Sequence, residues 1–306
     1  MLKVSVIIPT YGKPIFLNDA IISVLNQTLK NIELIIVDDN NPDTEVRQLT
    51  EKIVQKHTSL DQRITYIKHN KNKNGAVARN TGIAVAKGSY ISFLDSDDQY
   101  LNDRLQKCYD IAESSNESIA GVYTGCEFRR NGKRYKVHKE VFDGKFIKET
   151  LACTFMFSTG SNIFVRRNII EELNGFDEKF LRHQDYEFLV RLFQKYSLKA
   201  ITEVLVIKNN ENFNLPNVQK MISIKKQYLS KFKYVIQGLS QKEQNYIYKH
   251  NYISIAEQAL KIKQYELAKE YYTKVKEFGP LSFKSKSRKC LIHLLNYIKL
   301  NEKFLL

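Results

Sequence analysis

Four short apolar runs alternate with three helical patterns in the first hundred residues, and this alternation constrains the fold more than any other feature. The runs are "KVSVIIPT", "IELIIVDD", "RITYIKH" and "SYISFLD". Between them, apolar residues recur at helical spacing, as Leu17, Ile21 and Val24 do, and further helices are expected at 42–56 and 75–86. Apolar runs joined by helices predict a mostly parallel, Rossmann-like sheet with helices on both faces. We therefore expect an α/β fold.

The residues that follow these runs form the candidate site, because such sheets bind ligands beyond the carboxyl ends of their strands. The four ends read Pro9-Thr10-Tyr11, Asp38-Asp39-Asn40, His69-Asn70 and Asp95-Ser96-Asp97-Asp98. Clustered carboxylates need a compensating cation, and Mg²⁺ and Mn²⁺ prefer carboxylate oxygen. In an extended chain Asp95 and Asp97 would point to one side and Asp98 to the other. The simpler alternative is that Asp97 or Asp98 caps a helix beginning near Leu101.

The second half of the chain has a different pattern. The turn Asn131-Gly132 between two polar-apolar stretches predicts a hairpin, and a mixed α+β region follows. From about Pro216 the chain reads as helices, of which 256–280 resembles a single tetratricopeptide-type hairpin. We expect a catalytic domain over 1–215 and a basic, all-helical appendage over 216–306.

Charge and cysteine usage narrow the class of protein. Residues 221–306 hold 17 Lys and Arg against six Glu, which places +11 of the net +15 in this segment. Such a segment could meet nucleic acid, an anionic membrane or a phosphorylated substrate, or be a solvated helical face. The four scattered cysteines suggest neither a disulfide framework nor a zinc site. With no apparent signal peptide or membrane span, a cytoplasmic location is expected.

Four segments stand in series: "VSVIIPTYG", "IELIIVDDN", "NGAVARNTGIAVAKGSYISFLDSDD" and "LNGFDEKFLRHQDYEFLVRL". Together they resemble glycosyltransferase family 2, inverting enzymes with the GT-A nucleotide-diphospho-sugar transferase fold, of the type that builds bacterial polysaccharides or glycans. The resemblance covers roughly residues 1 to 210. It implies a UDP-sugar donor bound with Mn²⁺ or Mg²⁺, and transfer of a hexose, namely glucose, galactose or an N-acetyl derivative, to a hydroxyl of a saccharide acceptor.

The resemblance also implies roles for individual residues at the strand ends. In the "DSDD" segment, Asp97 matches the metal ligand of the family's D-x-D motif, and Asp98 is an assisting acid. The residues implied to contact the donor are Pro9, Thr10, Tyr11, Asp39, Arg79, Asp95 and Ser96.

An inverting transfer also needs a base near the acceptor hydroxyl, and such a base contributes about 10²- to 10⁴-fold to the rate. The family takes it from a Glu-Asp pair at a helix start, which here reads Gln184-Asp185. Asp185 is therefore the expected base, and Gln184 is a departure that bears on acceptor or metal contacts. Relatives often carry an Arg-x-His-like segment after the last strand. Here Lys208 is the electrostatic substitute, and His183 either touches acceptor or is a surface histidine.

Other classes of protein fit less well. A receiver domain would end with a Lys-Pro step, whereas the one Lys-Pro here is Lys13-Pro14, and a nucleotidyltransferase needs a Gly-rich loop after the first strand. An inactive nucleotide-sugar-binding scaffold stays open because of Gln184. The expected acceptor is a lipid-linked or protein-linked glycan rather than nucleic acid. The apolar stripe that includes Leu291, Leu294 and Ile298 suits a peripheral membrane contact, a homodimer contact or packing on the catalytic domain.

Overall fold

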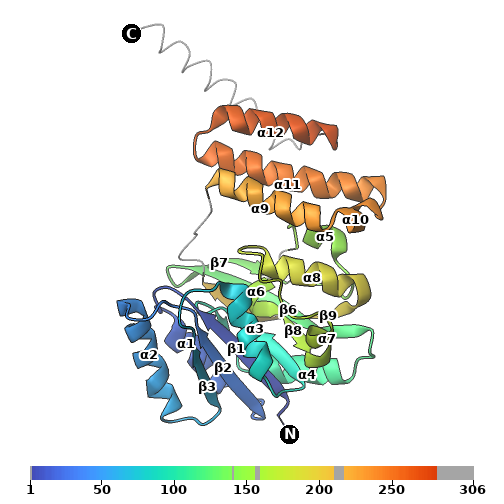
Figure 1. The fold of residues 1–306 in the computed structure, drawn as a ribbon. Coiled ribbons are helices and arrows are strands. Elements are labelled where there is room, and N and C mark those ends of the chain that lie inside the picture. The colour runs from blue at the N-terminus through green and yellow to red at the C-terminus, as the bar shows by residue number, and fades with distance from the viewer. Residues whose placement is uncertain (1, 140, 156–158, 210–216, 281–306) are drawn as a thin grey trace, which may run out of the picture. The chain divides into compact units, whose positions relative to one another are not determined.

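The computed structural model describes residues 2–139, 141–155, 159–209 and 217–280. Contacts within the chain divide it into two compact units (Figure 1). The first comprises the described parts of 1–145 and 156–213, and the second comprises Phe146–Phe155 together with the described residues from 217 onward. The short segment Phe146–Phe155 thus belongs with the helices, although it lies inside the range expected for the catalytic domain.

The first unit is built on one mixed sheet of nine strands in the order β3-β2-β1-β4-β8-β6-β9-β5, with β7 paired to β6. Strands β3, β2, β1 and β4 run parallel, as the apolar runs predicted, and β8 joins β4 in the antiparallel sense. The Asn131-Gly132 turn joins β6 to β7, which confirms the expected hairpin. The strands are β1 (Val4–Thr10), β2 (Ile32–Asp38), β3 (Ile64–Lys68), β4 (Tyr90–Phe93), β5 (Gln99–Tyr100), β6 (Ile119–Arg130), β7 (Lys133–His138), β8 (Phe164–Arg166) and β9 (Ser197–Asn209).

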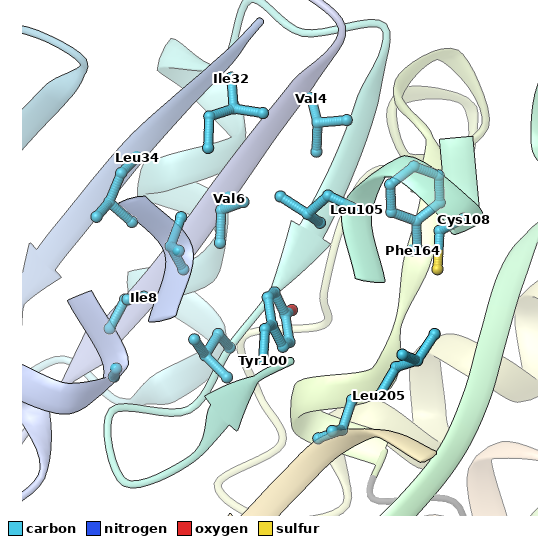
Figure 2. Close-up of a cluster of buried hydrophobic side chains, with 14 of the residues drawn as sticks. Val4, Val6, Ile8, Ile32, Leu34, Tyr100, Leu105, Cys108, Phe164 and Leu205 are labelled. Carbon is cyan, nitrogen blue, oxygen red and sulfur yellow. The ribbon is translucent and has the colours of Figure 1, made fainter. Parts of the chain in front are cut away.

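Helices cover both faces of the sheet because successive strand residues point to opposite sides. On one face Val6 of β1 packs in a core with residues of α1, α2 and α4 (Figure 2). On the other face Ile7 lies against Gly82 of α3, and Phe93 contacts Phe176, which stacks on Phe188 of α8. The helices of this unit are α1 (Leu17–Leu25), α2 (Glu45–Thr58), α3 (Gly75–Val85), α4 (Arg104–Glu113), α6 (Thr159–Asn162), α7 (Arg167–Glu172) and α8 (Gln184–Lys195).

The second unit is helical. Its core contains apolar residues of α9, α11 and α12, and α5 also contacts α11. Helices α11 and α12 form an antiparallel hairpin (Figure 1), and the tetratricopeptide-like pattern at 256–280 covers only the last part of α11 together with α12. Every helix in the described ranges is too short or too polar to cross a bilayer. The helices are α5 (Ile147–Leu151), α9 (Val218–Lys231), α10 (Lys233–Gln237), α11 (Gln241–Lys261) and α12 (Tyr265–Glu277). The apolar stripe near Leu291 and the residue Cys290 lie outside the described residues.

Candidate active site

Three carboxylates converge beyond the carboxyl end of β4. Oxygen atoms of Asp95, Asp97 and Asp98 all lie within 4.8 Å of one another. The backbone turns here, since the Asp98 amide donates to the Asp95 carbonyl at 3.0 Å, so the extended geometry expected from the sequence is wrong. Ser161 of α6 holds the turn. Its hydroxyl accepts from the Asp95 amide at 3.0 Å and donates to Asp98 Oδ2 at 2.5 Å.

Two basic side chains compensate this acid cluster of Asp95, Asp97 and Asp98. Lys208, near the end of β9, places its Nζ 2.9 Å from Asp98 Oδ2 and 3.4 Å from Asp95 Oδ2. Arg79 of α3 donates from NH2 to Asp95 Oδ1 at 2.6 Å. Three formal negative charges therefore face two positive ones, and the cluster keeps an excess of one negative charge.

The pKa values of the cluster follow from burial and from these neighbours. Burial opposes ionisation of Asp95, but Lys208 and Arg79 outweigh it and lower the pKa of Asp95. Burial raises the pKa of Asp98, which Lys208 only partly offsets. Asp97 is the exposed member, and partial burial of its carboxyl group with the negative charges of Asp98 and Asp95 raises its pKa to about 7. Burial alone would lower the pKa of Lys208, but the three carboxylates raise it above its ordinary value.

The helix-capping alternative for Asp97 and Asp98 is wrong. Strand β5 follows the acids directly, and α4 begins only at Arg104, with Asp103 as its N-cap residue. Asp98 is fully buried and accepts from Lys208, from Ser161 and from the amide of Asn209 at 3.0 Å. Asp98 therefore joins β9 to the turn after β4.

Asp39, one of the expected donor contacts, organises the loop between β3 and α3. Its Oδ1 lies 2.7 Å from His69 Nδ1 and accepts from the Lys73 amide at 2.8 Å. Its Oδ2 accepts from Asn72 Nδ2 at 2.8 Å and from the Asn74 amide at 2.9 Å. Asn74 in turn caps α3 by accepting from the second and third amides of that helix. Asp39 thus positions the helix that carries the guanidinium facing the acid cluster.

The segment after β1 lies beside this loop. The Thr10 carbonyl accepts from the Asp39 amide at 2.9 Å, and the Gly12 amide donates to Asn40 Oδ1 at 2.8 Å. Gly12 has a φ of +83°, which suits glycine at the turn. Pro9 is half-buried, Thr10 is buried, and Tyr11 is 65% exposed, so its ring is available to a ligand.

Asp185 lies in the first turn of α8, and its Oδ1 accepts from the Tyr186 amide at 3.0 Å. Burial raises the pKa of Asp185, while Arg79 opposes the shift and Asp95 adds to it. Arg79 also donates from NH1 to Gln184 Oε1 at 3.1 Å. One guanidinium therefore links the acid cluster to the start of α8 and acts electrostatically on the expected base.

Several contributors to the site were not among the sequence predictions. Asn209 donates from Nδ2 to the Asp97 carbonyl at 2.8 Å, and Ser161 supports Asp95 and Asp98. Gly160 lies so close to Asp95 that a Cβ would stand 2.3 Å from Asp95 Oδ2. The signal available for Asn209 was its position next to Lys208. Ser161 and Gly160 lie in α6, far from the acids in the sequence, and no motif marked them.

The donor set fits a divalent cation of the Mg²⁺ or Mn²⁺ type. Carboxylate oxygens are the ligands that these hard ions prefer, and the excess negative charge leaves room for one more cation. Asp97 is the member best placed to ligate, because its carboxylate is exposed whereas the other two are engaged by Lys208 and Arg79.

Solved structures share this architecture. The crystal structure of S. aureus TarS 1-349 in complex with UDP-GlcNAc matches with a TM-score of 0.55 and 14% identity, over 95% of this chain and 79% of that chain. A longer TarS chain is covered to 50%. The fold is thus of the GT-A class, with helices appended after the catalytic sheet.

Sequence comparison then assigns the family. The model for glycosyl transferase family 2 matches residues 5–174. An uncharacterized glycosyltransferase of Methanocaldococcus jannaschii is 33% identical over 231 residues, covering 74% of this chain and 76% of that protein. The amylovoran biosynthesis glycosyltransferase AmsB of Erwinia amylovora is 32% identical over 196 residues, covering 61% of this chain and 62% of AmsB. The chain belongs to glycosyltransferase family 2.

Proposed function

We propose that this protein transfers a hexose from a UDP-sugar to a hydroxyl of a saccharide acceptor with inversion, and that Asp185 is the general base. The observation that carries the proposal is the position of Arg79, which contacts Asp95 on the donor side and Gln184 at the start of the base helix. Family membership and the UDP-GlcNAc complex of the structurally similar TarS support the donor class.

The proposed reaction is a direct displacement at the anomeric carbon of the donor sugar. The acceptor oxygen attacks the anomeric carbon, and its proton passes to the Asp185 carboxylate. The bond between the anomeric carbon and the phosphate oxygen breaks, and its electron pair leaves with UDP. Burial raises the pKa of Asp185, which makes it a stronger base than an exposed aspartate.

The donor would bind along the carboxyl edge of β1, β2 and β4. Pro9, Thr10 and Tyr11 would line the base and ribose, while Asp39 would shape this subsite through the loop that it holds. Asp95 and Ser96 would contact ribose or sugar hydroxyls. These assignments carry the family pattern over to the matching positions of this chain.

The diphosphate would lie against the cationic side of the acid cluster. Arg79 and Lys208 would contact its oxygens, and Asp97, assisted by Asp98, would hold Mn²⁺ or Mg²⁺. That ion would neutralise charge on the leaving UDP. Gln184 fits this arrangement, because an amide leaves the positive charge of Arg79 to Asp95 and the incoming phosphate, whereas a glutamate would compete for it.

The acceptor would be a glycan of a cell-surface polymer. AmsB is named for amylovoran biosynthesis, and another relative from Bacillus subtilis is named as a putative teichuronic acid biosynthesis glycosyltransferase. These names support a polysaccharide or lipid-linked saccharide as the acceptor class.

The test is UDP release from UDP-glucose, UDP-galactose and their N-acetyl forms in the presence of Mn²⁺. We expect one donor to be hydrolysed slowly without acceptor, with release abolished by EDTA and by Asp185→Asn or Asp97→Asn. Asp103→Asn is the matched control, since Asp103 is exposed and its side chain makes no capping hydrogen bond to α4. Turnover that survives EDTA and Asp185→Asn would refute the mechanism. UDP-sugar binding without turnover would instead indicate a nucleotide-sugar-binding scaffold.

A further inference from the structure

The helical unit contains a pocket of about 370 Å³ with an unusual charge balance. Four of the described residues that line it are lysines, Lys225, Lys226, Lys233 and Lys274, and none of these described residues is an aspartate or glutamate. The other walls include three tyrosines from α11 and α12. Every described lining residue belongs to the second unit.

Lys225 is the central feature of this pocket, since it is only 3% exposed. Its ammonium donates to Asn251 Oδ1 at 2.8 Å, and among the described residues it has no carboxylate partner. Asn251 is fully buried and donates from Nδ2 to the carbonyls of Leu151 and Ile247, both at 2.9 Å, so its oxygen is held toward the lysine. An ammonium has three donors, and a buried charge without a counter-ion is costly. The site is therefore built to accept an anion.

The tyrosines of the lining indicate which chemical group is attached to that anion. Tyr252 and Tyr271 meet edge to face with ring centroids 5.8 Å apart, and Tyr248 lies 6.4 Å from Tyr252. Lys274 lies over the Tyr271 ring at 4.6 Å and pairs with Glu270 at 2.6 Å. Tyr248 and Tyr252 line the same pocket as the lysines. Aromatic rings beside an ammonium suit a sugar or polyol that is joined to an anionic group, because the rings pack against C–H groups while lysine binds the charge.

We propose that this pocket binds the phosphate group of a phosphorylated saccharide or polyol. Lys225 contacts a phosphate oxygen, and Lys226 and Lys233 raise the local positive potential, whereas Lys274 is already paired with Glu270. Phosphate fits better than carboxylate because it presents more oxygens and more charge to a site with several ammonium groups. The further statement that this phosphate belongs to the acceptor glycan rests on the proposed function. The proposal that the pocket binds a phosphate does not depend on it.

The experiment is calorimetric titration of the full chain with glucose 1-phosphate while UDP saturates the donor site. We expect saturable binding that Lys225→Met weakens about tenfold or more, since a hydrogen bond to a charged group is lost. Lys269→Met is the matched control, because Lys269 is an exposed lysine of α12 outside the pocket lining, and it should leave binding unchanged. Glucose alone should not bind, and inorganic phosphate should bind more weakly than the ester.

Thermal unfolding separates a binding role from a structural one. If Lys225 is retained for an anion, Lys225→Met removes an uncompensated buried charge, and the melting temperature without ligand should stay the same or rise. A marked fall in melting temperature combined with unchanged glucose 1-phosphate binding would overturn the proposal, as would equal binding of glucuronate and glucose 1-phosphate. UDP release without acceptor should be the same in wild type and Lys225→Met, so failure of this site and failure of the proposed activity are distinguishable.

Discussion

Replacing Lys208 by methionine should destabilise the first unit by about 3–5 kcal/mol, the usual cost of leaving a buried charge, here the carboxylate of Asp98, without its partner. Lys208 Nζ lies 2.9 Å from Asp98 Oδ2 and 3.4 Å from Asp95 Oδ2. With an effective dielectric constant of about 20, these pairs attract by about 6 and about 5 kcal/mol before desolvation is subtracted. Asp98 is fully buried, so water cannot replace the lost ammonium.

Thermal unfolding in EDTA measures this cost. For a unit of about 200 residues, each kcal/mol changes the melting temperature by about 2–4 °C, so Lys208→Met should melt roughly 6–20 °C below wild type. The matched control is Lys68→Met on β3, because Lys68 pairs with Glu51 at 3.0 Å but is half exposed. An exposed pair is worth about 0–1 kcal/mol, and this control should melt close to wild type.

Added Mn²⁺ extends the test to the acid cluster. The variant has one cation fewer against the same three carboxylates, so Mn²⁺ should raise its melting temperature more than it raises that of wild type. Equal melting temperatures of Lys208→Met and wild type in EDTA would refute the charge-compensation argument. Equal gains from Mn²⁺ would refute the inference that the cluster has spare capacity for a cation.

Three further substitutions test the proposed base Asp185, the position of the Asp95 carboxylate and the contact between Arg79 and Gln184. Asp185→Asn should lower transfer by about 10²- to 10⁴-fold without lowering the melting temperature. Because folding raises the pKa of Asp185, the ionised carboxylate lowers the stability of the folded state at neutral pH, and this cost is gone once the pH falls below the unfolded-state pKa. For the same reason, kcat/KM of the wild type should fall on acidification with an apparent pKa above that of an ordinary aspartate. A lower melting temperature of Asp185→Asn than of wild type, measured without ligand, would contradict this stability argument. Gly160→Ala should displace the Asp95 carboxylate, because Oδ2 would otherwise lie 2.3 Å from the new Cβ. We expect kcat/KM for the UDP-sugar to fall about 10- to 100-fold. Unchanged kinetics would show that activity does not depend on the position of the Asp95 carboxylate. In Gln184→Glu the new carboxylate should compete with Asp95 for Arg79 and raise KM for the UDP-sugar in steady-state kinetics. A lower KM would contradict the inference that the amide of Gln184 leaves Arg79 available to the phosphate.

Much of the first unit was predictable because local patterns encode it. The expected helix over 75–86 is α3, Gly75–Val85, and the expected strands at both of its ends are present. Apolar runs of four to seven residues identify buried strands without knowledge of their partners. The misplaced helix start near Leu101 shows the limit of such patterns. A two-residue strand precedes α4, and it pairs with residues of β9 that lie 106 and 108 positions downstream.

By itself the sequence determined the class of fold, the strand ends that hold the acids, and Asp185 at the start of a helix. Only the tertiary structure decided how the acids are neutralised, because Lys208 is 110 residues from Asp98 and no local pattern joins them. It also showed that Asp98 joins β9 to the turn after β4 rather than capping a helix, and it placed Phe146–Phe155 with the C-terminal helices. Periodicity reports which face of an element is buried, whereas the partner of a buried charge depends on packing between segments that are distant in the chain.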